Sequence, residues 1–138
     1  MAVLAQLEPK AVFHYFEEIC GIPHESSDTQ AISDYLVAFA KKRNLYVRQD
    51  TLGNVIIKKP ATSGYEDAPV VMLQGHMDMV CEKTDDKEID FHTQGLDLVL
   101  EGNVIHADRT TLGGDDGLLV FINSFSISCS CFVRNLST

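Results

Sequence analysis

The feature of the sequence that most constrains the fold is a short apolar run that ends in a glycine. The run Pro69–Leu73 has the composition of a strand buried in a sheet, and it ends at Gly75. His76 and Asp78 follow directly. Because open α/β sheets commonly place their sites just beyond the carboxyl ends of strands, this order predicts an α/β domain with its chemistry at that edge.

Helical and strand-like patterns lie on both sides of this run. Apolar residues recur at helical spacing over residues 8–20, and again up to about residue 43. The segment 26–28 offers side-chain oxygens that suit the N-cap of the second helix. Residues 46–58 and 96–105 have the patterns of hairpins. The sequence therefore predicts two amphipathic helices and two hairpins within one domain.

The charge balance and the cysteines narrow the class of protein. The 138 residues contain 20 Asp and Glu against 11 Lys and Arg, a formal net charge of -9, which disfavours nucleic acid and anionic membranes as partners. The first ten residues lack a basic segment followed by a long apolar run, so we expect neither a signal peptide nor a membrane anchor. Four irregularly spaced cysteines resemble neither a disulfide framework nor a CxxC zinc site, which favours a reducing cytoplasm.

His76 and Asp78 are the first candidate site residues. A histidine that binds zinc commonly has its other ring nitrogen oriented by a carboxylate, and this pair supplies both residue types. The alternative is a histidine and an aspartate that serve only the structure of a strand end. We assign surface or structural roles to the remaining histidines, which are His14, His24, His92 and His106.

Asp115 is the second candidate ligand because glycines bracket it. It follows Gly113 and Gly114 and precedes Asp116. A carboxylate on such a turn can bridge two divalent cations, and a cation would offset the repulsion between two adjacent carboxylates. A helix amino terminus, where capping and the macrodipole favour Asp, is the competing interpretation.

Two sequence blocks together resemble a known family. They are LQGHMDMV at 73–80 and ADRTTLGGDDG at 107–117, and both are similar to blocks of the aminoacylhistidine dipeptidase family. This is a family of two-zinc peptidases, also known as Xaa-His or cytosol non-specific dipeptidases. The segment EPKAVFHYFEEICGIPHES at 8–26, the hairpin GNVIIKKPAT at 53–62 and the loop that ends at Asp90-Phe91 also resemble it. The likeness covers roughly residues 5–117.

The resemblance implies a fold, a cofactor and a set of site residues. It implies an α/β fold in which helices flank a mostly parallel sheet, with residues 1–117 as the N-terminal part of the catalytic domain. His76 would bind one zinc ion and Asp115 would bridge two, with manganese or cobalt as alternative metals. Asp78 would be the catalytic residue that orients or adjoins the site, and a water between the ions would attack the substrate.

The resemblance also implies partners and a location. The substrates would be dipeptides, notably those with a C-terminal histidine, and the enzyme would be cytoplasmic. Neither nucleic acid nor membrane is expected as a partner. For the full-length form of the protein, we consider a homo-oligomer.

The sequence departs from the family pattern in three ways. Arg109 stands where the family usually has glycine, and Asp116 stands where it often has asparagine. Family members are several times longer, and their general-base glutamate, its neighbouring glutamate ligand, a further aspartate and a final histidine lie downstream of this motif. Residues 117–138 contain no Asp, Glu or His, so only Cys129 and Cys131 could bind metal there.

Residues 118–138 form a divergent tail. A helix is favoured from Leu118 to Ile122, whereas residues 126–131 alternate with the period of a strand. Two alternatives to a working dipeptidase follow. The chain could be a truncated, alternatively spliced or frame-shifted product that is catalytically inactive, with uncovered strand edges that promote aggregation. It could instead be an interaction fragment that pairs with an intact subunit.

Overall fold

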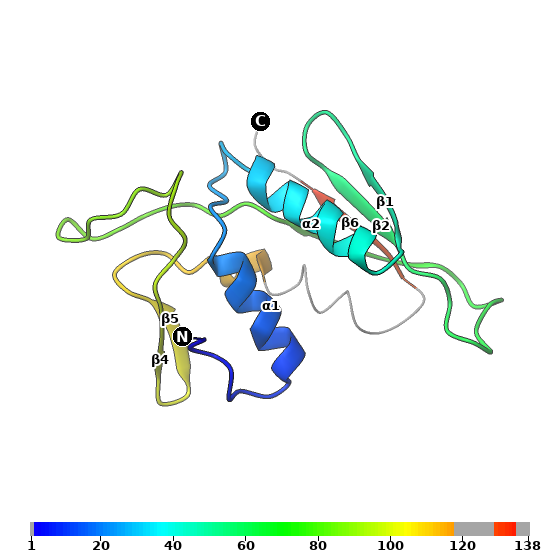
Figure 1. Ribbon diagram of the computed structural model, residues 1–138, viewed down its shortest axis with the longest axis horizontal. Helices are drawn as coiled ribbons and strands as arrows, with labels where there is room; N and C mark the ends of the chain where they lie inside the picture. The colour runs from blue at the N-terminus through cyan, green and yellow to red at the C-terminus, as the bar shows by residue number, and fades with distance from the viewer. Residues whose placement is uncertain (1, 118–128, 135–138) are drawn as a thin grey trace.

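The computed structural model describes residues 2–117 and 129–134 (Figure 1). Helices α1 and α2 come first in the chain and are followed by strands β1 to β6. The expected helix at 118–122 lies outside the described residues, whereas residues 114–117 are helical. The bounds are α1 (Lys10–Cys20), α2 (Gln30–Lys42), β1 (Tyr46–Gln49), β2 (Val55–Lys58), β3 (Val71–His76), β4 (Leu98–Glu101), β5 (Val104–Ala107) and β6 (Cys129–Arg134).

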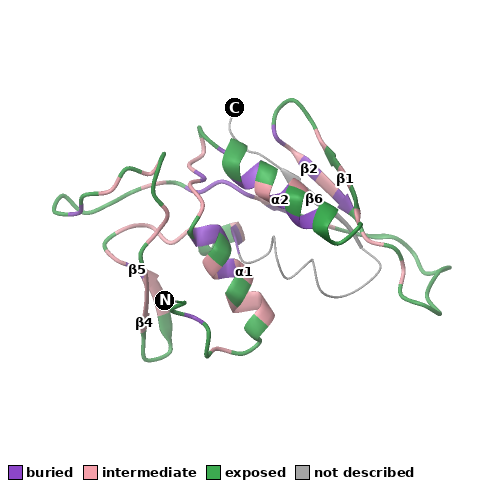
Figure 2. Cartoon of the chain, viewed as in Figure 1, coloured by how far each residue is buried: buried purple, intermediate pink, exposed green. Residues whose placement is uncertain are grey.

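Both helices bury one face, as the sequence predicts (Figure 2). α1 buries Phe16 and Ile19, which are three residues apart and therefore lie on one side of the helix. The N-cap expected for α2 within residues 26–28 is wrong, because α2 begins after Thr29. The hydroxyl of Ser26 instead donates a hydrogen bond to Asp78.

The larger sheet has four strands in the order β1-β2-β6-β3. β1 and β2 form an antiparallel hairpin, and β2 also pairs antiparallel with β6. β6 pairs in parallel with β3 along its whole length, from Val71 opposite Cys129 to His76 opposite Arg134. The second sheet is the antiparallel hairpin of β4 and β5.

The described residues do not show the mostly parallel sheet that the sequence predicts. Among the named strands, parallel pairing is confined to β3 and β6, and the other strand pairs are antiparallel. For the β1–β2 and β4–β5 pairs the physical reason is the connection length, because strands joined by a short turn pair in opposite directions. Both hairpins that the sequence predicts have such turns, and the turn of the second is formed by Gly102 and Asn103.

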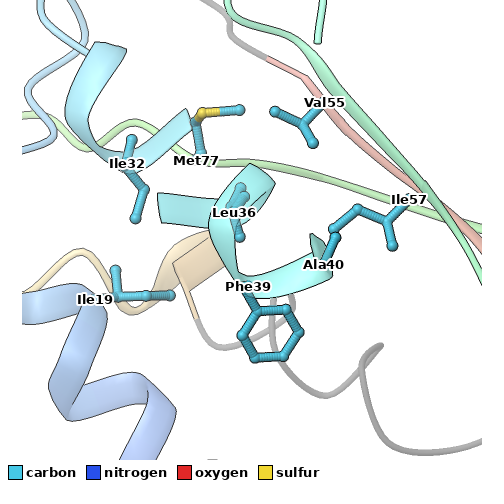
Figure 3. Packing of buried hydrophobic residues seen from close by; sticks show 8 residues of the cluster. All are labelled: Ile19, Ile32, Leu36, Phe39, Ala40, Val55, Ile57 and Met77. Carbon is cyan, nitrogen blue, oxygen red and sulfur yellow. The ribbon is translucent and has the colours of Figure 1, made fainter. Parts of the chain in front are cut away.

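The main core lies between the helices and the larger sheet (Figure 3). α2 packs against β1 and β2. Met77, which directly follows β3, reaches into the same cluster. This packing anchors the chain immediately beside His76. The buried members of the core are Ile19, Ile32, Leu36, Phe39, Ala40, Val55, Ile57 and Met77.

A second, smaller core joins α1 to the β4–β5 hairpin, which lies beside that helix in Figure 1. Leu4, Phe16 and Cys20 are its buried members. Gly95 allows the segment before β4 to approach the end of α1, because a Cβ there would lie 2.6 Å from the carbonyl oxygen of Gly21. The segment that leads to Asp115 is thereby tied to the helical part of the molecule.

β3 is less buried than its composition predicts. Val71 and Met72 are 42% and 66% exposed, and Val70, which directly precedes the strand, is 77% exposed. β3 lies at one edge of the four-stranded sheet, whereas α2 packs over β1 and β2 at the other end. The strand exists as predicted, but its first half presents apolar side chains to solvent. No helix in the described part of the chain is long and apolar enough to cross a membrane.

Candidate metal centre

The end of a strand and a short helical segment bring the candidate side chains together. His76 is the last residue of β3, and the helical residues 114–117 carry Asp115 and Asp116. The buried side chain of Met79 lies beside Gly113, where a Cβ would come within 2.8 Å of the Met79 sulfur. Gly113 also has a φ of 68°, in the left-handed region that favours glycine. Glycine at 113 therefore allows the turn before Asp115 to lie close against the segment that follows β3.

The orientation of the His76 ring is set by Asp78. Nδ1 of His76 lies 3.0 Å from the backbone oxygen of Asp78 and 3.3 Å from its Oδ1. Both of these oxygens are acceptors, so in the neutral ring the favoured tautomer has the proton on Nδ1 and the lone pair on Nε2. The free lone pair is the one that a metal ion requires.

Nε2 of His76 faces two carboxylates. It lies 3.9 Å from Oδ1 of Asp115 and 3.8 Å from Oδ2 of Asp116. Asp115 is 94% exposed, whereas Asp116 is half-buried and its Oδ2 accepts a hydrogen bond of 3.4 Å from the backbone nitrogen of His76. The peptide bond between the two aspartates is cis.

These three side chains have the composition of a divalent cation site. One ligand atom from each of His76, Asp115 and Asp116 lies within 4.8 Å of the others, and they form the one such cluster among the described residues. A lone pair and two carboxylates that face one another repel unless a cation or a proton lies between them. Imidazole nitrogen and carboxylate oxygen are ligands that zinc accepts, so the residues present fit the ion.

Asp78 lies on the opposite side of the ring from these ligands. It is buried, and its Oδ2 accepts a 2.7 Å hydrogen bond from the hydroxyl of Ser26. Its Oδ1 is buried without a hydrogen-bond partner and has the imidazole of His76 as its ion-pair neighbour. A buried carboxylate oxygen is costly without a partner, which makes a charged or metal-bound imidazole a favourable neighbour.

The structure thus brings His76 and Asp115 together and places Asp78 on the other side of the His76 ring. Sequence reasoning noted the charge of Asp116 but did not include it among the ligands, although its position next to Asp115 was a visible signal. It missed Ser26, which is 52 residues from Asp78 in the sequence and has no local pattern that marks it. Cys129 and Cys131 lie in β6, and their side chains lie outside the described part of the structure.

The other histidines lie in different surroundings. His24 is buried, and burial lowers its pKa because it disfavours the charged ring, an effect that the Ile22 carbonyl and Asp78 partly offset. His92 is exposed between Glu25 and Asp28, at 3.3 and 3.4 Å. His14 pairs with Glu18 on α1, and His106 lies in β5 with Glu101 nearby.

Arg109 stands at a position where the family that the sequence resembles usually has glycine. Its φ is 59°, in the region where glycine is the preferred residue. The side chain compensates through contacts, because its guanidinium hydrogen-bonds to Asp108 and Asp86. The turn before Asp115 therefore keeps the conformation that a glycine would favour.

Comparisons with known proteins identify the family of the chain. No protein-family model matches the chain. The chain is 39% identical over 118 residues to the cytosol non-specific dipeptidase of Escherichia coli (strain K12). Its fold matches the crystal structure of aminoacylhistidine dipeptidase from Vibrio alginolyticus with a TM-score of 0.89 and 34% identity, over 98% of this chain. The chain belongs to the aminoacylhistidine dipeptidase family.

The chain spans only part of the length of its family relatives. The alignment with the E. coli protein covers 86% of this chain and 24% of that relative, and the match to the Vibrio structure covers 29% of that chain. A tripeptidase from Staphylococcus aureus subsp. aureus Mu50 has a TM-score of 0.67 at 18% identity, over 91% of this chain and 36% of its own. These structural neighbours show an α/β domain of the peptidase type.

Proposed function

We propose that the chain supplies a metal-binding part of a peptide-hydrolysing site. His76 and Asp115 would hold zinc ions, with manganese or cobalt as alternatives, and Asp116 would contribute a further carboxylate. The observation that carries the proposal is the convergence of three acceptor side chains within 4.8 Å. Family membership supports it independently, because the relatives are named as peptidases.

The residues of this chain would prepare the site in two ways. Asp78 keeps the proton on Nδ1 of His76, so the Nε2 lone pair remains directed at the carboxylates of Asp115 and Asp116. The exposed carboxylate of Asp115 suits a bridging role because solvent and substrate can reach it. Two divalent cations at such a site lower the pKa of a bound water and polarise the peptide carbonyl.

The proposed substrates are dipeptides, including those with a C-terminal histidine. Support comes from the names of the relatives, a cytosol non-specific dipeptidase and an aminoacylhistidine dipeptidase. The name of the E. coli relative supports a cytosolic location, with which the free Cys20 and Cys81 are compatible. We also propose that residues 1–117 contribute to a larger catalytic domain that contains a mostly parallel sheet.

The 138 residues alone are proposed to bind metal without turnover. A two-metal hydrolytic site needs about three or four donors for each ion and a general base. Residues 117–138 contain no Asp, Glu or His, so further carboxylate and imidazole donors would come from other polypeptide segments. The catalytically inactive alternative therefore applies to the isolated chain and is compatible with the proposed metal site.

The test combines zinc titration calorimetry with an assay of dipeptide hydrolysis. We expect the 138-residue chain to bind Zn²⁺ and His76→Ala to lose that binding, because the imidazole is the one nitrogen ligand of the cluster in the described residues. His14→Ala, which removes an exposed histidine on α1, is the matched control and should bind normally. Equal zinc affinity in the wild type and in His76→Ala would overturn the proposal.

The activity arm uses the E. coli relative as a positive control. We expect the relative to hydrolyse an Xaa-His dipeptide and to stop when the metal is chelated, while the 138-residue chain binds zinc without turnover. Hydrolysis by the isolated chain that survives both chelation and His76→Ala would contradict the assignment of the site.

A further inference from the structure

A hydrogen bond between Ser26 and Asp78 lies beside the proposed metal centre. The hydroxyl of Ser26 donates a 2.7 Å hydrogen bond to Oδ2 of Asp78, and it lies 3.3 Å from the backbone oxygen of Met79. Ser26 is half-buried and precedes α2, whereas Asp78 follows β3. The contact therefore joins two segments that are distant in the sequence.

The backbone holds Ser26 opposite Asp78. The nitrogen of Met79 donates to the oxygen of His24 at 3.0 Å, and the nitrogen of Ser26 donates to the oxygen of Met79 at 3.2 Å. Glu25 and Met79 form an isolated parallel bridge between the same segments. Because these bonds fix both backbones, the Ser26 hydroxyl is presented to Asp78 in a defined position.

The hydrogen bond determines which way the carboxylate of Asp78 faces. With Oδ2 held by Ser26, Oδ1 is directed at Nδ1 of His76, 3.3 Å away. Without the hydroxyl, Asp78 would have no such restraint on the rotation of its carboxylate about the bond to Cβ. Groups that orient a metal-binding histidine affect metal affinity even though they do not touch the ion.

We propose that Ser26 is a positioning residue, which acts through Asp78 to hold the His76 ring with Nε2 directed at Asp115 and Asp116. The inference rests on the proposed function for its consequence in zinc binding. Its first step, the orientation and tautomer of the His76 ring, is a property of the metal-free chain and can be measured there.

The test compares Ser26→Ala and Ser26→Thr with the wild-type chain. We expect Ser26→Ala to weaken zinc binding by about tenfold, the low end of the range for groups that orient metal ligands. We also expect it to shift the ¹⁵N resonances of the His76 ring in the metal-free chain toward a mixture of tautomers. Ser26→Thr retains a hydroxyl and should restore both properties.

Ser33→Ala controls for a purely structural effect. The buried hydroxyl of Ser33 donates a 2.7 Å hydrogen bond to the oxygen of Gly53, away from the metal centre. Its loss should lower thermal stability while leaving zinc affinity and the His76 resonances unchanged. If Ser33→Ala changes them as much as Ser26→Ala does, the effect of Ser26 is general destabilisation and the inference is wrong.

The remaining outcomes separate this inference from the proposed function. If His76→Ala abolishes zinc binding while Ser26→Ala changes neither the affinity nor the ring resonances, only the role of Ser26 is refuted. If zinc binding survives His76→Ala, the metal site itself is refuted. In that case a shift of the ring resonances in Ser26→Ala, restored in Ser26→Thr, would still support the positioning role.

Discussion

At the scale of single residues, Gly113 determines how closely the two ligand-bearing turns approach. We expect Gly113→Ala to destabilise the chain by about 1 to 2 kcal/mol, because alanine is strained in the left-handed region. Its Cβ would also lie 2.8 Å from the sulfur and 3.1 Å from the Cβ of Met79. Urea unfolding measures the loss, and zinc titration should show weaker binding because the turn that carries Asp115 is displaced.

Gly114→Ala is the matched control for this substitution. A Cβ at Gly114 would meet the Cδ2 of Leu112 at 4.0 Å, which is an ordinary contact, and residue 114 is helical. Its effect on unfolding should stay within about 0.5 kcal/mol. Equal losses in the two variants would show that the conformation of Gly113 has no special importance.

Residue types revealed part of the candidate site. His76 and Asp115 could be selected because each combines a ligand side chain with neighbouring glycine, and the structure brings them to 3.9 Å. Ser26 could not be selected, since its partner is distant in the sequence and its own surroundings favour an N-cap. Side-chain contacts between remote turns depend on packing, and a single sequence does not encode them as a local pattern.

At the scale of the elements, a cluster of ion pairs fastens the loop after β3 to the end of β5. The ammonium group of Lys87 is buried and lies 2.8 Å from Asp97 and 2.9 Å from Asp108. Arg109 links the same cluster to Asp86 at 3.0 Å. These contacts hold the segment that leads into the Asp115 turn.

This cluster predicts a contribution to stability that depends on pH. Hydrogen bonds from Arg109, and then from Lys87, lower the pKa of Asp108 from 3.8 to about 2. A carboxyl group with a lowered pKa stabilises the folded state above its ordinary pKa and loses that contribution as the pH falls through its folded value. We therefore expect Asp108→Asn to be less stable than the wild type at pH 7.

The stability difference between the wild type and Asp108→Asn should narrow as the pH falls from about 4 to about 2. Urea unfolding at several pH values measures it. Asp67→Asn, which changes an exposed carboxylate in the loop before β3, is the control and should follow the wild type. A difference that stays constant across this range would show that Asp108 does not supply the effect.

The helices and hairpins could be predicted because their signals are local. Helical periodicity placed α1 and α2, and the Gly102-Asn103 turn marked the second hairpin. The pairing of β6 could not be predicted, because β6 lies between β2 and β3 and contacts both across a long separation in the sequence. The sequence of β6 contains no local pattern that identifies β2 and β3 as its partners.

At the scale of the whole molecule, the exposed apolar side chains of β3 favour association between molecules. The strand lies at a sheet edge, and Val71 and Met72 present apolar surface there. Edges of this kind pair with other chains unless a charge interrupts them. We expect the wild-type chain to self-associate as its concentration rises and Met72→Lys to reduce this association.

Light scattering coupled to size-exclusion chromatography measures the effect. Met72 is 66% exposed, so its replacement should change the free energy of unfolding by no more than about 0.5 kcal/mol. Leu52→Lys is the matched control, since Leu52 is 72% exposed but lies in the turn between β1 and β2. An equal reduction in both variants would indicate a general effect of charge rather than an effect of the β3 edge.

The position of the ligands on two separate turns has a consequence for folding. The end of β3 and the turn at Asp115 are joined in the chain by a long excursion through the β4–β5 hairpin. A cation shared by His76 and Asp115 would close that excursion into a ring, much as a disulfide does, and the free energy of its binding would add to that of folding. Loss of the ion would then open this cross-link as well as remove the reactive centre.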